Sequence, residues 1–88
     1  MEKGLLAAVR RFPLRSLYIR QLAIADDAFL SLCNDLADAE AAVELWALST
    51  TSQRDLRRNE YEVLANELAA EIEQRLDVHV SERTASAG

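Results

Sequence analysis

Residues 27–48 read DAFLSLCNDLADAEAAVELWAL and contain neither glycine nor proline. Their apolar side chains recur at alternating intervals of three and four residues: Phe29, Leu32, Leu36, Ala39, Val43 and Trp46. That spacing places them in one seam along one side of a helix, as in a coiled coil. The other side carries acidic residues with no basic residue among them: Asp35, Asp38, Glu40 and Glu44. The stretch therefore predicts a long helix that needs a partner helix.

Residues 53–76 supply that partner. Four small hydroxyl residues at 49–52 end the first helix, because such side chains compete for backbone hydrogen bonds. The apolar positions that follow have helical spacing: Leu56, Tyr61, Leu64, Ala65, Leu68, Ala69, Ile72 and Leu76. A loop this short joins antiparallel neighbours. The sequence therefore predicts an all-α fold built on an antiparallel helical hairpin of residues 27–48 and 53–76.

One or two short N-terminal helices, over residues 3–12 and 13–25, are predicted to pack on this hairpin. Pro13 separates them, because its ring disfavours helical geometry in the residue before it and suits the first turn of a new helix. The expected inward residues are Leu5, Leu6, Val9 and Phe12 in the first helix, and Leu14, Leu17, Tyr18, Leu22 and Ile24 in the second. The result is a three-helix bundle or, if two copies pair, a dimeric four-helix bundle.

The charge distribution favours the same docking. Residues 1–20 carry one acidic residue, Glu2, and five basic ones: Lys3, Arg10, Arg11, Arg15 and Arg20. Their net charge of +4 leaves −9 for residues 21–88, so the two parts attract each other. The single helical domain is expected to span residues 1–76. Residues 77–88 are small and polar and are expected to form a disordered tail.

Three local features mark the hairpin. Asp26 or Asp27 is the expected N-cap of the long helix, and Trp46 is expected to be buried in its seam. The second helix carries the pattern Glu60-Tyr61-x-x-Leu64-x-x-Glu67-Leu68-x-x-Glu71-Ile72. An Asp-x-x-Phe helix start combined with these features resembles small uncharacterised bacterial helical-hairpin proteins, over residues 14–76. The resemblance implies the fold and supplies no activity.

Bulk composition excludes several classes of protein. A chain of 88 residues holds one domain at most, and its net charge is −5. Generic nucleic-acid binding needs a basic surface, so no nucleic-acid partner is expected. The single cysteine, Cys33, excludes an intrachain disulfide and fits a reducing, cytoplasmic location. No apolar run reaches the roughly 20 residues needed to span a bilayer.

The residues that catalysis or metal binding requires are sparse. His79 is the only histidine and is expected to be solvated beside the tail. Cys33 lies next to the seam without a basic neighbour, so we expect it to pack; a redox role is the alternative. Acidic pairs such as Glu40 and Glu44 lack the Glu-x-x-His motif of di-iron bundles. We therefore expect no enzyme, no cofactor and no metal site.

Arg54, Arg57 and Arg58 form a basic cluster just after the turn. Three guanidinium groups at this spacing could hold an anion beside the loop hydroxyls. The alternative is that they pair with Glu40 and Glu44 at the end of the preceding helix.

The remaining interpretation is a non-enzymatic protein–protein interaction module that self-associates, most simply as a homodimer, or docks on another protein. Apolar and aromatic residues are the candidates for its interface: Leu30, Cys33, Leu45, Trp46 and Val63. The alternative is a peripheral membrane-surface or nucleic-acid-associated regulator that uses the basic segment of residues 1–20.

Overall fold

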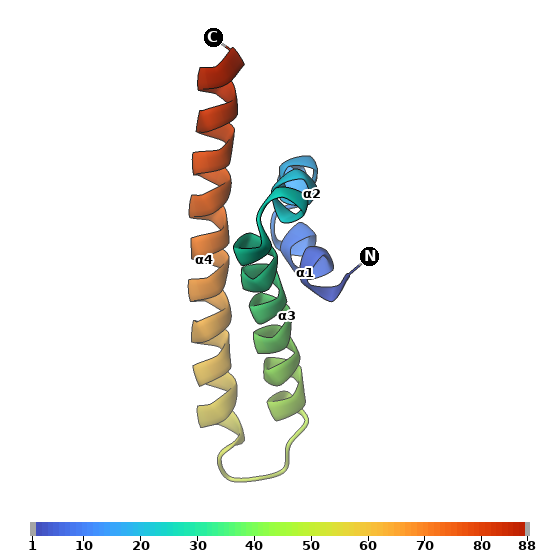
Figure 1. Ribbon diagram of the computed structural model, residues 1–88. Coiled ribbons are helices and arrows are strands. Elements are labelled where there is room, and N and C mark those ends of the chain that lie inside the picture. Colours follow the sequence, from blue (N-terminus) through green and yellow to red (C-terminus); the bar gives the residue numbers. More distant parts are fainter. Residues whose placement is uncertain (1, 88) are drawn as a thin grey trace.

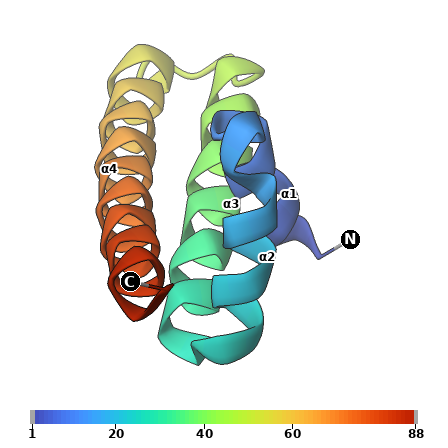
Figure 2. The same cartoon turned by 90° about the horizontal axis from the view of Figure 1, so that it is seen from above.

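The computed structural model describes the backbone of residues 2–87 and the side chains of residues 2–85. Helices α3 (Asp27–Ala47) and α4 (Arg54–Ala87) form the predicted antiparallel hairpin (Figure 1). Two shorter helices precede it, α1 (Lys3–Arg11) and α2 (Ser16–Ala25), joined by a 3-10 turn at Pro13–Arg15. Seen from above, α3 lies between α4 on one side and α1 and α2 on the other (Figure 2). The all-α prediction is confirmed.

The core follows the seam of α3. Phe29, Leu32, Leu36 and Ala39 are buried against α4, which contributes Ala65, Ala69, Ile72 and Leu76. These four residues of the α3 seam were predicted correctly, because a strict three-and-four spacing fixes which side of a long helix faces its partner, whereas Val43 and Trp46 are only half-buried. Asp26 caps α3 as expected, since its carboxylate accepts hydrogen bonds from the backbone N–H of Ala28 at 3.0 Å and of Phe29 at 3.2 Å.

Two apolar residues in the half of α4 nearer the turn are less buried than predicted. Leu56 and Leu64, both predicted to face inward, remain 58% and 41% exposed. Leu56 lies in the first turn of α4, where α1 and α2 do not reach (Figure 1), and Leu64 lies on the side of the seam away from α1, so no third helix covers either side chain.

Helix α1 docks through its small residues. Gly4, Ala7 and Ala8 are buried, whereas Leu5, Val9 and Phe12 are half-buried at the edges and Leu6 is 37% exposed. A Cβ atom at Gly4 would lie 2.7 Å from the backbone nitrogen of Asn34 and 2.9 Å from the carbonyl carbon of Cys33. The two backbones therefore approach closely at Gly4, and a large inward side chain would prevent it. The predicted inward residues Leu5, Val9 and Phe12 therefore pack at the edges of this contact, whereas Leu6 was wrongly included and the small residues at the centre were missed.

Helix α2 is also rotated relative to the prediction. Ile19 and Ala23 are its buried residues, whereas Leu14, Leu17 and Ile24, expected inside, are 99%, 64% and 88% exposed. The sequence of α2 is apolar on nearly every side, so periodicity does not select one face. Tyr18 and Leu22 pack against the core as expected.

Helix α4 continues eleven residues beyond Leu76, to Ala87, where a disordered tail was predicted. The extension contains no glycine or proline and is rich in residues compatible with a helix. Its first turn also meets the N-terminal part of the chain: Arg15 pairs with Asp77 at 2.7 Å, and the Tyr18 ring meets His79 edge-on at 6.0 Å between centroids. The expected tail is therefore helical over residues 77–87; Gly88 lies outside the described residues.

Candidate interaction surface

Two grooves flank the seam between α3 and α4. One lies on the side where α1 packs and has a volume of about 720 Å³. Basic residues of α1 face acidic residues of the hairpin across it: Lys3, Arg10 and Arg11 against Asp38, Glu40, Glu44 and Glu62. Lys3 pairs with Asp38, and Arg11 pairs with Glu40 at 2.8 Å. We call it the charged groove.

These ion pairs confirm that the basic N-terminal segment docks on the acidic hairpin. Arg11 also donates a hydrogen bond to Asn66 Oδ1 at 3.1 Å, so it bridges α3 and α4. Its side chain and that of Glu40 are about 30% exposed, which leaves this pair less screened by solvent than the Lys3–Asp38 pair. In the charged groove, basic side chains of α1 are thus paired with acidic side chains of the hairpin.

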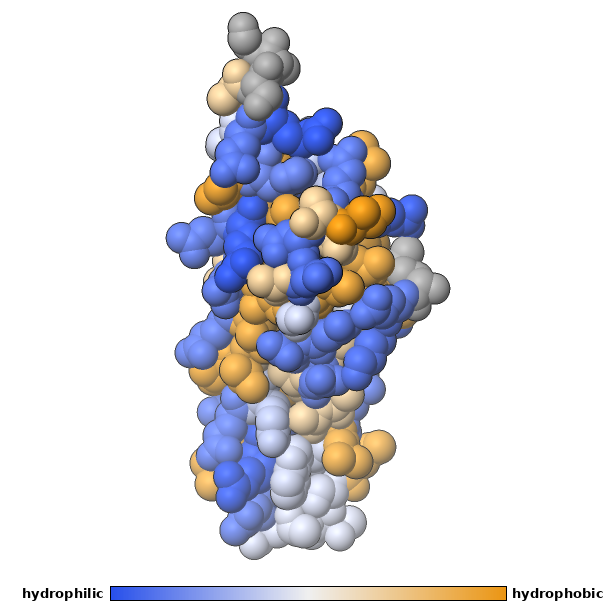
Figure 3. All heavy atoms as spheres, viewed as in Figure 1, coloured by the Kyte–Doolittle hydropathy of each residue, from blue (hydrophilic) through white to orange (hydrophobic). Residues whose placement is uncertain are grey.

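The second groove lies on the other side of the seam and has a volume of about 460 Å³. Its lining residues all come from α3 and α4: Asp35, Asp38, Ala39, Ala42, Tyr61, Leu64 and Leu68. We call it the apolar groove. Trp46, half-buried, extends it toward the turn, because it follows Ala42 by four residues on the same side of α3. Hydrophobic atoms are visible at several places along the hairpin below α1 (Figure 3).

The apolar groove has the same spacing on both helices but opposite charges at its ends. Asp35, Ala39, Ala42 and Trp46 follow one another at helical intervals on α3, and Arg57, Tyr61, Leu64 and Leu68 do so on α4. Because the helices are antiparallel, Asp35 lies toward the α2 end of the hairpin and Arg57 toward the turn. Asp35 and Asp38 therefore line the groove on its α3 side, and Arg57, which also meets Glu60, lies beyond its end toward the turn.

The arginine cluster after the turn pairs within its own helix. Arg54 meets Asp55 at 3.3 Å, Arg57 meets Glu60 at 3.1 Å, and Arg58 meets Glu62 at 3.7 Å. The predicted pairing with Glu40 and Glu44 across the hairpin is wrong, because carboxylates one, three and four residues away are closer in space than those of the facing helix end. Each guanidinium already faces one carboxylate, which weakens the case for an anion at this cluster.

The five interface residues suggested by the sequence fall in different environments. Leu45 and Val63 are 70% and 49% exposed, and Trp46 is half-buried rather than enclosed in the seam. Leu30 packs against the core, and Cys33 is fully buried beneath α1. Cys33 is therefore removed from any interface by the docking of α1. Burial raises the pKa of its thiol to about 11, with a smaller contribution from the Glu2 carboxylate.

Sequence inspection missed the apolar groove as a unit. The groove residues of α3 have a helical spacing that is visible in the sequence. Tyr61, Leu64 and Leu68 of α4, however, were assigned to the seam together with the other apolar residues of that helix. His79 was also misplaced: it is half-buried against Tyr18, and no side chain or backbone group of the described residues forms a hydrogen bond with its Nε2. Among the described residues, no three His, Cys, Asp or Glu side chains gather closely enough to hold a metal ion.

Comparisons with known proteins find no matching family model, no similar curated protein and no similar solved structure. The resemblance of residues 14–76 to small bacterial helical-hairpin proteins stays a prediction. None of the described helices combines the length and the apolar character that crossing a membrane requires.

Proposed function

We propose that this protein is a non-enzymatic interaction module that pairs with a second copy of itself through the apolar groove. Two copies pack groove to groove in antiparallel orientation, so that the two hairpins form a four-helix bundle. A two-fold axis relates the copies, and each uses the same surface.

The observation that carries this proposal is the placement of Asp35 at one end of the apolar groove and of Arg57, which also meets Glu60, just beyond the other end. When a second copy lies antiparallel in the groove, Arg57 of each copy approaches Asp35 of the other. The two contacts are equivalent by symmetry, as a two-fold interface requires. A parallel arrangement would place Asp35 against Asp35 and Arg57 against Arg57, which electrostatic repulsion disfavours.

The apolar residues between these charges supply the energy of association. Leu64 is 41% exposed in the single chain, and Trp46, Tyr61 and Leu68 are half-buried. Burying the remainder contributes about 25 cal/mol per Å² of apolar surface. A small helical domain buries a limited core of its own, so a second hairpin adds substantially to its stability.

Sedimentation equilibrium tests the proposal directly. We expect a dimer at about 100 μM, a concentration that favours pairing over the dissociated chain for a micromolar affinity. Leu64→Glu places a charge in the groove and should give a monomer of 9.8 kDa. Val63→Glu is the matched control, because Val63 is 49% exposed on a different side of α4 and should leave the dimer intact. A wild-type monomer, or equal effects of both variants, would refute pairing through this groove.

A charge exchange tests the orientation. Asp35→Arg and Arg57→Asp should each weaken the dimer by about 0.5–2 kcal/mol, because each brings like charges together at both ends. The double variant restores opposite charges and should recover most of the affinity. Additive weakening in the double variant would contradict the antiparallel arrangement.

A further inference from the structure

The outward side of α2 and the turn before it carry three aliphatic side chains that touch little of the protein. Leu14, Leu17 and Ile24 are 99%, 64% and 88% exposed. Leu17 and Ile24 lie seven residues apart, on the side of α2 opposite its buried residues Ile19 and Ala23. We call these three residues the α2 ridge. Helix α2 lies at the other end of α3 from the turn (Figure 1).

Fractional exposure this high means that the side chains project from the surface. A leucine that is 99% exposed has almost no contact with neighbouring residues, so the ridge is convex at Leu14. Protein interfaces usually place their energetically important residues in well-packed pockets that exclude water. A lipid bilayer needs no complementary pocket, because its acyl region yields around an inserted side chain.

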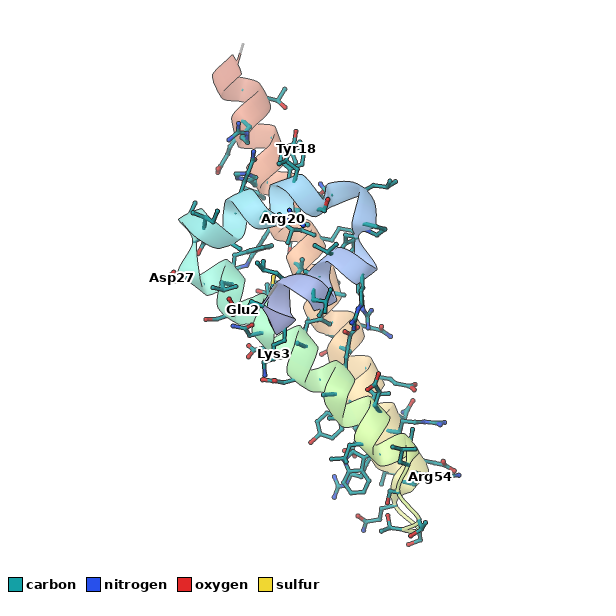
Figure 4. All side chains as sticks on the ribbon, turned by 90° about the vertical axis from the view of Figure 1, so that its right-hand side faces the viewer. Glu2, Lys3, Tyr18, Arg20, Asp27 and Arg54 are labelled. Atoms are coloured by element: carbon teal, nitrogen blue, oxygen red, sulfur yellow. The ribbon has the colours of Figure 1, made fainter. Side chains whose placement is uncertain are left out.

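Among the described residues, one unpaired cation lies next to the ridge, and two carboxylates, Asp26 and Asp27, follow directly after α2. Helix α2 and the turn before it, residues 13–25, contain Arg15 and Arg20 and no acidic residue. Arg15 is bound to Asp77, whereas Arg20 makes no ion pair within the described part of the chain. Figure 4 looks onto the side of α1 and α2 and shows Arg20 on α2. Arg20 lies three residues after Leu17 and four before Ile24, next to the ridge.

We propose that the α2 ridge docks on a membrane surface rich in anionic phospholipid. Leu14, Leu17 and Ile24 insert among the acyl chains near the headgroups, and Arg20 contacts lipid phosphates. The aliphatic ridge distinguishes this partner from a nucleic acid, whose backbone would be met by arginines without projecting leucines. The contact is shallow and reversible, since three side chains and one cation give modest affinity.

This surface differs from the basic segment of residues 1–20 that the sequence alone suggested as a membrane contact. Leu5, Val9 and Phe12 pack against the core, and Lys3 and Arg11 are held by hairpin carboxylates, so they do not serve a membrane in the folded chain. Ile24, beyond residue 20, takes part instead. The ridge also leaves the apolar groove free, so the inference does not depend on the proposed dimer.

Vesicle sedimentation with the full chain tests the inference. The probes are vesicles of phosphatidylcholine alone and vesicles containing about one third phosphatidylglycerol, at low and physiological salt. We expect binding to the anionic vesicles, weaker binding to the neutral ones, and further weakening with salt. Leu17→Ser and Ile24→Ser should each reduce the partition coefficient about tenfold, given the transfer energy of a large aliphatic side chain. Arg20→Gln should reduce binding to the anionic vesicles and leave the neutral ones unaffected.

Leu48→Ser and Leu56→Ser are the matched controls, because these leucines are 84% and 58% exposed at the turn, at the opposite end of the hairpin. Helicity measured by circular dichroism should be unchanged in all of these variants, since each residue lies on the surface. Absence of binding to anionic vesicles would overturn the inference, and so would an equal loss in ridge and control variants. If the ridge variants abolish self-association instead, the ridge is a contact between copies and the lipid proposal fails.

Discussion

At the contact between α1 and α3, close packing of the two helices requires small side chains. Gly4 and Cys33 occupy the contact between α1 and α3, where larger side chains would separate the helices. Cys33 has lost all exposure to solvent there. A thiol in that position is a small apolar residue with its proton firmly held, rather than a nucleophile.

The burial of Cys33 predicts a specific loss of stability in alkali. Its pKa rises from 9.0 to about 11 in the folded chain, so between these values the folded state binds more protons than the unfolded state. The free energy of unfolding therefore falls as pH rises through this window, by on the order of 2 kcal/mol from this group, and is unaffected by it below the window. Urea unfolding of wild type and Cys33→Ala across the window measures the effect. Parallel pH profiles for the two proteins would contradict it.

At the scale of helices, α3 carries a second apolar stripe beside its seam. It consists of Leu30, Cys33, Ala37, Ala41, Leu45 and Leu48. Helix α1 is nine residues long and covers the upper part of this stripe, so Leu45 and Leu48 remain exposed below it. Two features thus decide how much of this stripe α1 buries. They are the length of α1 and the position of Gly4, where α1 crosses α3.

Gly4→Ala should loosen the docking of α1. Alanine normally favours a helix over glycine by about 1 kcal/mol, but here its Cβ would meet the backbone of Asn34 and Cys33. Backbone cannot move aside as a flexible side chain does, so we expect net destabilisation of about 1–3 kcal/mol. Urea unfolding measures it. Arg10→Ala, at an exposed position of the same helix, is the control and should change stability by less than about 0.5 kcal/mol. A more stable Gly4→Ala protein would show that the backbones of α1 and α3 do not approach so closely at Gly4.

At the scale of the whole molecule, the chain is long and thin. Its extents are 56 × 22 × 21 Å, and its radius of gyration is 14.9 Å. A compact domain of this length would have a radius of gyration of about 12 Å. An elongated shape exposes more surface per residue, so less of the apolar surface of the hairpin is buried within one chain. This shape is the physical reason why a second copy would stabilise the protein.

The proposed dimer predicts that thermal stability depends on protein concentration. Mass action should raise the melting temperature by roughly 3–6 °C for each tenfold increase in concentration. Thermal melts followed by circular dichroism would measure this dependence of melting temperature on concentration. The protein concentration should span about 5 to 500 μM, a range around the micromolar affinity assumed above. Leu64→Glu should melt at one temperature throughout. If the melting temperature of the wild-type protein is also independent of concentration, the proposed dimer is wrong.

The sequence by itself determined the features that depend on neighbours along the chain. The helical content, the Asp26 cap, the hairpin and the α3 side of its seam follow from hydrogen bonding and periodicity within a few turns. The ion pair between Glu71 and Arg75, at 3.5 Å, has the same local origin. In each case the signal is a spacing within one segment, even where, as in the hairpin, the residues that meet are distant in sequence.

The tertiary structure decided how the short helices rotate and where α4 ends. Helices α1 and α2 are apolar on several sides, and the selection of the inward side depended on how closely α1 could approach α3 at Gly4. The same packing buried Cys33, exposed Leu14 and gave residues 77–80 contacts with α2. These outcomes depend on the shape of a surface assembled from distant segments, and the pattern of a single segment does not contain that shape.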